Sequence, residues 1–217
     1  IKMAPVRMRY KARNGTECVL NLIDTPGHSD FSYEVSRSLA AVEGAVLLVD
    51  ATQGIQAQTL ANFHAARNAG LVIIGAVNKI DLNPPHIDRC IADLAKLIGA
   101  DEKDILRVSG KTGEGVPDLL EAVVQNVPPP RTSAPDTQAL IFDSFYDEHK
   151  GVIAYVRVFG GTLAANAQAH LAVADAGFTI REVGTFAPEL CPAPSLGSGM
   201  IGWVATGVKD TELVRIG

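Results

Sequence analysis

The sequence lacks any long hydrophobic run. Its strongest apolar stretches, residues 44–50 and 71–77, are short and are closed by polar or turn residues. Because a membrane-spanning helix needs about 18 or more consecutive apolar residues, neither stretch can cross a bilayer, and both are predicted to be buried strands. The first residues, Ile1, Lys2 and Met3, are not followed by the apolar core of a signal peptide. We therefore expect a globular protein without a transmembrane segment, in a reducing compartment.

Cysteines and clustered metal ligands are also scarce. Cys18, Cys90 and Cys191 are odd in number, far apart and without C-x-x-C spacing, which argues against a disulfide framework or a zinc site. We interpret all three as small buried hydrophobic residues. The histidines never recur three or four residues apart, as a helical metal site would require. A metal site built from protein ligands alone is therefore not expected.

Neither sign of charge dominates the chain. Its net charge is −5, so attraction of the whole molecule to nucleic acid is not expected, DNA is not expected as a partner, and any RNA contact must be local. Near the start, Arg7, Arg9, Lys11 and Arg13 alternate with apolar residues, so these four cations should share one face of a strand. Such a face suits either docking on RNA or a solvated edge strand whose charges prevent aggregation; we favour the second interpretation.

Residues 18–127 alternate short apolar runs with longer periodic segments. This is the pattern of βα units around a parallel sheet. Strands are predicted at 18–23, 45–49, 72–78 and 105–108, with helices between them. Ahead of the first strand, residues 6–12 are separated from it by the turn cluster Arg13, Asn14 and Gly15. The two segments should therefore form a hairpin, which would make the sheet mixed.

The character of the chain changes after Val127. Pro128, Pro129 and Pro130 begin a stiff extended stretch, and beyond it helical periodicity gives way to short β-rich runs separated by glycines. Strands are predicted at 139–145, 152–159, 169–174, 178–185 and 200–204. The sequence therefore predicts an α/β domain at residues 1–130, a linker at 131–137 and a small β-barrel or sandwich at 138–217.

The segment Asp24, Thr25, Pro26, Gly27, His28 directly follows a predicted buried strand. An aspartate there lies at the carboxyl edge of the sheet, where such folds bind ligands, and it can hold Mg²⁺ through water. The glycine lets a backbone N–H approach a phosphate closely, and the histidine lies beside it. The same residues also suit an ordinary turn with a helix-capping histidine, so the segment taken alone leaves both interpretations open.

A second segment, Asn78, Lys79, Ile80, Asp81, has the N-K-x-D pattern and ends another predicted strand. Guanine presents two adjacent hydrogen-bond donors that one carboxylate, that of Asp81, can accept, and adenine lacks this pair. The amide of Asn78 can tie its loop to neighbouring elements, while the aliphatic stem of Lys79 can cover the plane of the base. The pattern therefore predicts recognition of guanine.

A third segment, Ser109, Gly110, Lys111, Thr112, Gly113, follows the next predicted strand. It is similar to the S-A-K loop that completes a guanine pocket in GTPases, with Gly110 where alanine is common. A backbone N–H can still donate to the guanine carbonyl after that change. Three loops in this order, each after a strand, predict a GTPase-type nucleotide site at one edge of the sheet.

The residues from Asp24 to Leu39 resemble the second switch of translational GTPases. More narrowly, FSYEVSRSLAAVEGAVLLVDATQGIQAQTLAN at 31–62 resembles the elongation factor 4 (LepA) family, and QALIFDSFYDEHKGVIAYVRVFGGTL at 138–163 resembles the second domain of that family. Departures are small: Ser29 stands where valine is frequent, and the insert at 83–85 is local. The implied fold class is an α/β P-loop-NTPase-like G domain, with a mixed sheet and flanking helices, followed by an all-β barrel domain.

This resemblance implies an enzyme that hydrolyses GTP on the ribosome, in back-translocation or rescue of stalled ribosomes. It implies GTP or GDP and Mg²⁺ as ligands, ribosomal RNA and proteins as partners, a monomer, and a cytoplasmic location with peripheral contact to the inner face of the cell membrane. His28 would position the attacking water, Asp24 would support Mg²⁺ through water, and the N–H of Gly27 would sense the γ-phosphate. The implied nucleotide-binding residues are Asp24, Thr25, Pro26, Gly27, Asn78, Lys79, Asp81, Ser109, Gly110 and Lys111.

No segment matches G-x-x-x-x-G-K-[ST], the loop that holds the β- and γ-phosphates. Gly110, Lys111 and Thr112 supply the letters G-K-T, but Ile105 stands where the first glycine belongs. We therefore expect the phosphate loop and the first switch to lie upstream of Ile1, and the chain to be a fragment that is inactive alone. Two alternatives stay open: a scaffold related to GTPases that only binds the ribosome or a partner, and a translational GTPase of another branch, such as elongation factor G.

Overall fold

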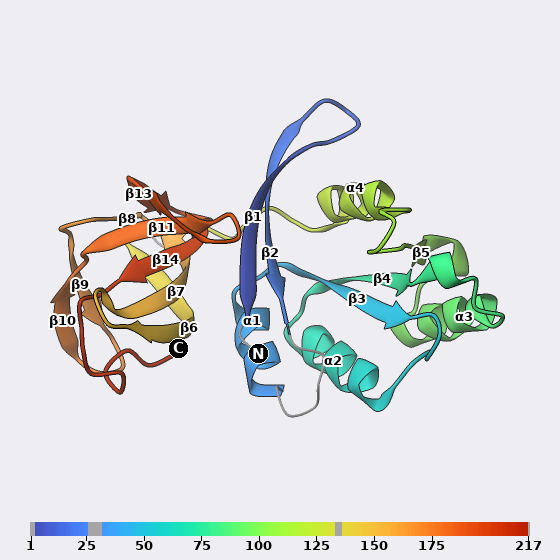
Figure 1. Cartoon of the computed structure of the whole chain (residues 1–217), viewed down its shortest axis with the longest axis horizontal. Helices are drawn as coiled ribbons and strands as arrows, with labels where there is room; N and C mark the ends of the chain where they lie inside the picture. Colours follow the sequence, from blue (N-terminus) through green and yellow to red (C-terminus); the bar gives the residue numbers. More distant parts are fainter. Residues whose placement is uncertain (1–2, 26–31, 133–135, 217) are drawn as a thin grey trace.

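The computed structural model describes residues 3–25, 32–132 and 136–216. An α/β part lies beside an all-β part (Figure 1). The α/β part comprises β1 (Ala4–Lys11), β2 (Glu17–Asp24), α1 (Ser32–Ala40), β3 (Gly44–Asp50), α2 (Ala57–Asn68), β4 (Val72–Asn78), η2 (Ile80–Leu82), α3 (Ile87–Ile98), η3 (Glu102–Asp104), β5 (Leu106–Arg107) and α4 (Val116–Asn126). The all-β part comprises β6 (Gln138–Asp147), β7 (Gly151–Gly160), β8 (Thr162–Ala164), β9 (Gln168–Leu171), β10 (Ala176–Thr179), β11 (Glu182–Phe186), β12 (Leu190–Ala193), β13 (Ser195–Gly197) and β14 (Ile201–Ala205).

The α/β part is built on a parallel sheet of order β3-β4-β5. Helix α3 covers it because its buried residues, Cys90, Ile91, Leu94 and Ala95, recur at helical spacing. They join Val77 of β4 in one apolar cluster. The helix ends at Gly99, whose φ of 73° is the left-handed conformation that glycine adopts without strain.

The predicted hairpin is present, but it forms a sheet of its own. Strands β1 and β2 pair antiparallel, whereas β3, β4 and β5 pair parallel, and no ladder joins β2 to β3 within the described ranges. Both kinds of pairing expected for a mixed sheet therefore occur, in two separate sheets. The prediction that Arg13 shares a face with the other cations is wrong, because β1 ends at Lys11 and the turn brings Arg13 to Asp118 of α4.

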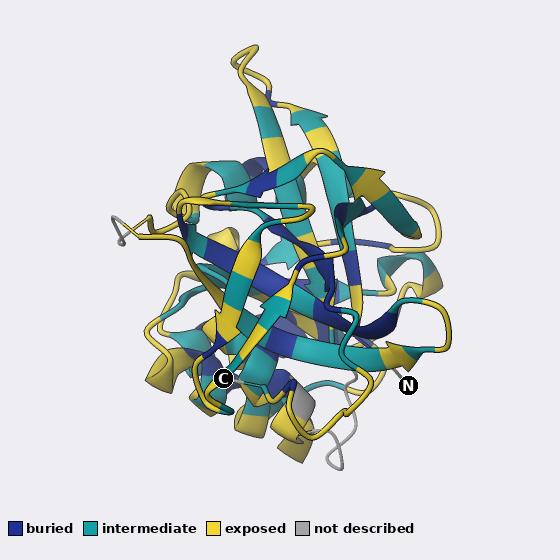
Figure 2. Ribbon diagram, turned by 90° about the vertical axis from the view of Figure 1, so that its left-hand side faces the viewer, coloured by how far each residue is buried: buried dark blue, intermediate teal, exposed yellow. Residues whose placement is uncertain are grey.

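The all-β part curls around a second apolar cluster. A five-stranded sheet of order β12-β11-β14-β7-β6 and two small ladders, β9-β10 and β8-β13, surround it. Figure 2 shows its buried residues as dark blue bands across the strands. The single strand predicted at 178–185 is wrong. The segment divides into β10 and β11, because the two residues between them have different partners. The Ile180 N–H donates to the carbonyl of Ala167, just before β9, while the Arg181 N–H donates to the carbonyl of Ala205 in β14.

A third apolar cluster joins the two parts. Met3 and Ala41 pack with Phe142, Phe186 and Trp203 of the all-β part. Since these residues come from both parts, the parts share a core and are not merely tethered. The fold-class prediction of an α/β domain followed by an all-β barrel domain is confirmed.

The interpretation of the cysteines is correct for one residue. Cys90 is buried in α3, and burial raises the pKa of its thiol. Cys18 and Cys191 are half-buried, because the first lies in the hairpin and the second in the edge strand β12. Separately, none of the helices in the described part of the chain is long and apolar enough to cross a membrane.

Candidate functional site

The candidate site lies where the strands of the parallel sheet end. Strands β3 and β4 are in register over their whole length, so Asp50 at the end of β3 pairs with Asn78 at the end of β4. The pairing continues beyond β5, since the Val108 N–H donates to the carbonyl of Val77 at 2.9 Å. The loops at 78–81 and 109–113 therefore begin level with each other at one edge, as expected for the carboxyl ends of parallel strands.

Asn78 connects the two loops. Its side-chain oxygen accepts hydrogen bonds from the N–H of Lys79 at 2.8 Å and from the N–H of Gly110 at 3.0 Å. Gly110 lies 32 residues after Asn78 in the chain, so one acceptor joins two loops that are distant in the sequence. The side chain fixes the spacing between the loops, which is the linking contact that the N-K-x-D pattern suggested.

Asp81 and Ser109 form a second link. The Ser109 hydroxyl donates to Oδ1 of Asp81 at 2.7 Å, and the N–H of Thr112 donates to the same hydroxyl oxygen at 3.1 Å. Ser109 is fully buried, so its hydroxyl has little freedom to exchange these partners for water. The hydroxyl therefore sets the orientation of the Asp81 carboxylate.

Lys79 reaches back to β3. Its φ of 67° places it in the left-handed region, and its Nζ lies 2.7 Å from Oδ2 of Asp50. Oδ1 of Asp50 accepts from both the N–H and the hydroxyl of Thr52. Burial acts to raise the pKa of Asp50, but the hydrogen bonds and the charge of Lys79, with the hydrogen bonds from Thr52, bring it below the ordinary value. Asp50 is thus held ionised as the counter-charge of Lys79.

Asp50 was not among the site residues predicted from the sequence. It ends a buried strand, which is the same signal that singled out Asp24, yet no motif marked it. Its contact with Lys79 depends on β3 and β4 being adjacent and in register. That adjacency is a property of the sheet and not of either segment.

The remaining residues of the third loop are exposed. Gly110 and Lys111 lie at its surface, and the loop is closed by hydrogen bonds from Gly113 N–H to Ser109 and from Ser109 N–H to Glu114. A methyl group added at Gly110 would lie 3.8 Å from the nearest atom, on Asn78, which is an ordinary contact. Alanine, common here in GTPases that the segment resembles, would therefore fit.

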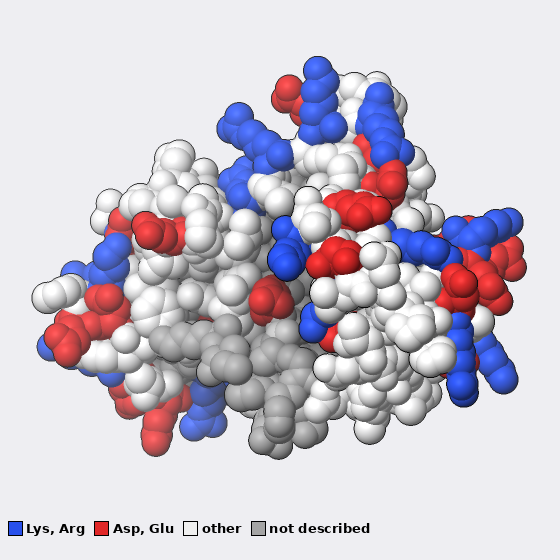
Figure 3. All heavy atoms as spheres, turned by 45° about the vertical axis from the view of Figure 1, so that its right-hand side comes forward, with Lys and Arg blue, Asp and Glu red and all other residues white. Residues whose placement is uncertain are grey.

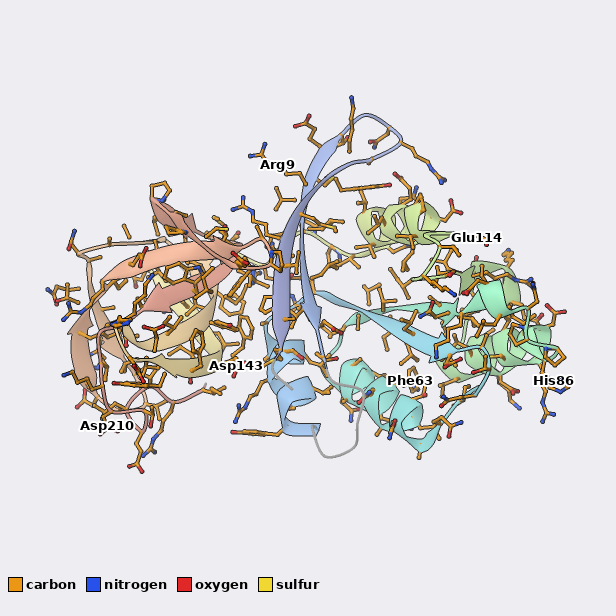
Figure 4. The ribbon with its side chains drawn as sticks, viewed as in Figure 1. Arg9, Phe63, His86, Glu114, Asp143 and Asp210 are labelled. Carbon is orange, nitrogen blue, oxygen red and sulfur yellow. The ribbon has the colours of Figure 1, made fainter. Side chains whose placement is uncertain are left out.

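A hollow of about 640 Å³ opens beside Asp81, on the side of α4. Ile80 and Asp81 line it from one loop, Glu114, labelled in Figure 4, lines it from the loop before α4, and Asp118 lines it from the first turn of α4. Asn78, Lys79 and Ser109 do not line it. The hollow therefore adjoins the residues predicted to read guanine and is not centred on them.

The segment after β2 is described in part. Asp24 is exposed at the end of β2, and Thr25 follows it half-buried. Pro26, Gly27 and His28 lie outside the described residues, so the structure says nothing about the predicted catalytic histidine. In Figure 1 β2 ends beside α2 on the side nearer the all-β part, while β3, β4 and β5 end toward α3. The structure thus brings together the two predicted guanine-reading loops and leaves Asp24 apart from them.

Comparison with known proteins agrees with the motifs. A family model described as the elongation factor Tu GTP-binding domain matches residues 1–129. The whole chain is 51% identical over 219 residues to elongation factor 4 of Cutibacterium acnes and 47% identical over 218 residues to elongation factor 4 of Synechocystis. The chain spans 36% of the length of each of these relatives. The resemblance to the elongation factor 4 family is confirmed.

Solved structures with the same fold are also translation factors. The chain aligns over its full length with 37% of the bacterial selenocysteine-specific elongation factor EF-Sec, at a TM-score of 0.78 and 19% identity. It aligns over 92% of its length with 45% of the elongation factor SelB from Methanococcus maripaludis, at a TM-score of 0.70 and 19% identity. At this identity the likeness concerns the fold alone.

Proposed function

Because the chain belongs to the family of the elongation factor Tu GTP-binding domain, we propose that the complete protein binds guanine nucleotides and hydrolyses GTP as a translational GTPase of the elongation factor 4 type. One observation carries the proposal. Asn78 accepts from Gly110 while Ser109 donates to Asp81, so two loops far apart in the chain are locked together around one carboxylate. Asp81 thereby presents a fixed double acceptor to the two donors of guanine.

The other loop residues complete the recognition of guanine. The salt bridge to Asp50 holds the ammonium of Lys79, so its aliphatic stem is positioned to cover the base plane. Lys111 is exposed, and its backbone N–H would donate to the guanine carbonyl, whereas the N–H of Gly110 already donates to Asn78. Specificity for guanine comes from these contacts, since an adenine would leave the Asp81 carboxylate without matching donors.

The phosphates and Mg²⁺ would lie at the end of β2. Mg²⁺ keeps several waters and takes one or two carboxylates together with substrate phosphates, and the exposed carboxylate of Asp24 fits that role through water. Mg²⁺ would neutralise charge on the phosphates. Thr25, Pro26 and Gly27 would line this side, with the N–H of Gly27 directed at the γ-phosphate and His28 placed to orient the attacking water.

We further propose three regions: a G domain at 1–130, a linker at 131–137 and the second-domain barrel at 138–217. The G domain lacks its first strand and its phosphate loop. Val19 and Leu22 of β2 and Val46 and Leu48 of β3 support this, because these apolar side chains are 38 to 51% exposed and no ladder among the described residues joins β2 to β3. Another strand would cover them.

The proposed partner is the ribosome, which the protein would contact through ribosomal RNA and proteins. We propose that the protein is a monomer in the cytoplasm, with peripheral contact to the membrane. The proposed task is back-translocation or rescue of stalled ribosomes. The relatives named elongation factor 4 support this choice. A scaffold that binds the ribosome without hydrolysing GTP is the second candidate, favoured by the absence of G-x-x-x-x-G-K-[ST] from the 217 residues.

His28→Ala in the complete protein separates the two candidates. We expect GTP affinity to stay within about twofold, because the imidazole orients water and does not hold the nucleotide, while ribosome-stimulated hydrolysis falls by about 100-fold or more. Single-turnover hydrolysis on purified ribosomes measures the second quantity, and competition with a fluorescent GTP analogue measures the first. His64→Ala, an exposed histidine of α2, is the matched control and should change neither.

Hydrolysis that stays fast in His28→Ala would remove this residue from the proposed catalytic role. A complete protein that binds ribosomes but hydrolyses no GTP even with His28 present would establish the scaffold instead.

The 217-residue chain alone is expected to bind GTP weakly. Its guanine-reading loops are assembled, but most of the affinity for a nucleotide comes from backbone donors, a lysine and Mg²⁺ acting on the phosphates, and the phosphate loop that supplies them is missing from its sequence. Isothermal titration with GTP and Mg²⁺ should give a dissociation constant weaker than about 100 μM. A micromolar or tighter constant would show that the phosphates bind at residues other than those proposed.

A further inference from the structure

The β1–β2 hairpin carries a strip of cations on one face. Arg7, Arg9 and Lys11 alternate along β1 and so point to the same side, with successive side chains about 7 Å apart. We call these three residues the cationic face. Opposite them in register on β2 lie Asn21, Val19 and Glu17, so one acidic residue accompanies three cations.

The other face of the hairpin is held by acidic residues of α4. The Tyr10 hydroxyl donates to Oε1 of Glu121 at 2.7 Å, and the N–H of Arg13 donates to the same oxygen at 2.7 Å. The Arg13 guanidinium pairs with Asp118. The hydrogen bond from Tyr10 lowers the pKa of Glu121, so this carboxylate stays ionised at neutral pH. Asp118 and Glu121 of α4 are thus committed to positioning the hairpin, and Glu17, opposite Lys11, is the one carboxylate in register with the cationic face.

The cationic face itself has no such partners. Within residues 3–25, 32–132 and 136–216, neither an ion pair nor a side-chain hydrogen bond engages Arg7, Arg9 or Lys11, and the last two are exposed. Arg9, labelled in Figure 4, points away from α4. Figure 3 shows lysine and arginine side chains gathered over the hairpin, where it projects beyond the rest of the α/β part. Although the net charge of the chain is −5, the cationic face is therefore a local region of positive charge on a hairpin that α4 holds in place.

Protection of an edge strand does not account for this arrangement. Part of β1 already lies against β11 of the all-β part, so that part of the strand does not need charges to prevent pairing with another chain. Evenly spaced cations along a rigid strand suit a polymer of evenly spaced anions. Two of the three are arginines, whose planar guanidinium matches phosphate oxygens with two parallel hydrogen bonds.

We propose that the cationic face of the β1–β2 hairpin binds the sugar-phosphate backbone of RNA. The choice of RNA over other polyanions rests on the proposed function on the ribosome. The contact itself is independent of the nucleotide, since the hairpin cations and the loops at 78–81 and 109–113 lie on separate elements. It recognises backbone phosphates and not base sequence.

The test is the salt dependence of RNA binding by the 217-residue chain. Anisotropy of a short fluorescein-labelled RNA hairpin is measured between 50 and 200 mM KCl for the wild type and for the triple variant Arg7→Gln, Arg9→Gln, Lys11→Gln. Each lost phosphate contact lowers the slope of log affinity against log salt by about 0.7 to 0.9, so the triple variant should lose about 2 to 3. The ratio of wild-type affinity to variant affinity should therefore fall by roughly 20- to 40-fold between 50 and 200 mM KCl.

A matched variant removes the same charge elsewhere. Arg89→Gln, Lys96→Gln, Lys103→Gln changes three exposed cations on and after α3 and should leave the slope as in the wild type. Arg9→Gln alone should lower the slope by about 1, which tests the proposal even if the triple variant folds poorly.

Three results would overturn the proposal. An equal slope in wild type and triple variant excludes a phosphate contact by these residues. Displacement of the RNA by polyglutamate at matched charge would assign the face to acidic polypeptides, and equal affinity for a DNA duplex of the same length would end the assignment to RNA. None of these results bears on GTP binding, which is measured separately by the titration and the His28 experiment.

Discussion

Asp81→Asn in the complete protein is expected to weaken GTP binding by about 10²- to 10⁴-fold and to shift preference toward xanthine nucleotides. The carboxylate would accept two hydrogen bonds from guanine, and each hydrogen bond to a charged group contributes about 1.5 to 3 kcal/mol. Their loss corresponds to about 3 to 6 kcal/mol, and each 1.4 kcal/mol is a factor of ten in affinity. No other single change to the reading loops removes both contacts.

The hydrogen bond from Ser109 determines which atom of the new asparagine side chain faces the base. The Ser109 hydroxyl donates to Oδ1 of Asp81, and in the asparagine variant the side-chain oxygen can keep that contact. The amide nitrogen then occupies the other position and offers donors where the carboxylate offered an acceptor. Xanthine carries an oxygen at the 2-position, where guanine carries an amine, so it meets a donor.

Competition of GTP and XTP against a fluorescent analogue measures both effects. Asp88→Asn is the matched control, because it replaces a carboxylate by an amide in the same way. Asp88 is exposed in the first turn of α3 and pairs with Arg107, outside the two loops. It should leave both affinities unchanged. An Asp81→Asn protein that binds GTP as tightly as the wild type would contradict the assignment of this carboxylate to guanine.

Glu43→Ala is expected to destabilise the chain by about 3 kcal/mol. Glu43 accepts a hydrogen bond from Arg157 of β7 at 2.6 Å, and the Arg157 side chain is 1% exposed. Burial lowers the pKa of Arg157, while the carboxylate of Glu43 raises it in part. Removing one partner of a buried pair costs about 3 to 5 kcal/mol, and we take the lower end because Glu43 keeps 15% exposure.

The pair also connects the two parts of the molecule. Arg157 donates in addition to the carbonyl of Gly199, and the N–H of Arg131, at the start of the linker, donates to Glu43. Nε of Arg157 has no hydrogen-bond partner among the described residues, so the guanidinium has little to replace the lost carboxylate. The loss should therefore appear at the junction between the α/β and all-β parts.

Urea unfolding followed by tryptophan fluorescence provides the measurement. Trp203 is the single tryptophan, fully buried in the cluster shared by both parts, so its emission reports on this junction. Asp93→Ala removes an acid from the exposed pair with Arg89 and should cost about 0.5 kcal/mol or less. If Glu43→Ala shifts the midpoint no more than Asp93→Ala does, the buried pair does not hold the parts together.

Several features were predictable because they depend on neighbours in the chain. The short apolar runs became β2, β3 and β4, because such segments closed by turn residues favour strands, but the prediction that the first of them is buried is wrong, since no residue of β2 is buried. The helix around Leu94 followed from its apolar period, and the hairpin from the turn at Gly15. The split at Ile180 was not predictable, since it depends on hydrogen bonds to Ala167 and to Ala205 of β14, which are not neighbours of Ile180 in the sequence.

The candidate site shows the same division. The residues that recognise the base could be predicted from the N-K-x-D pattern and from the loop at Ser109, because recognition of guanine needs a carboxylate placed after a strand. The contact of Asp50 with Lys79 and the contact of the Ser109 hydroxyl with Asp81 could not be predicted, because each joins segments at the ends of different strands. Arg13 was assigned to the wrong face because a turn, not the strand period, decides where it points.

The sequence alone thus determined the family, the order of the elements and the chemistry offered at the ends of β4 and β5, since these depend on residue identity and local spacing. Only the tertiary structure decided which side chains share a hydrogen bond, and that Glu43 and Arg157 pair in a buried junction. It also decided that α4 holds one face of the hairpin, while Arg7, Arg9 and Lys11 on the other face make no ion pair within the part of the chain that the structure describes. Contacts between distant segments depend on how strands and helices pack, and that packing is a property of the whole chain and not of any segment within it.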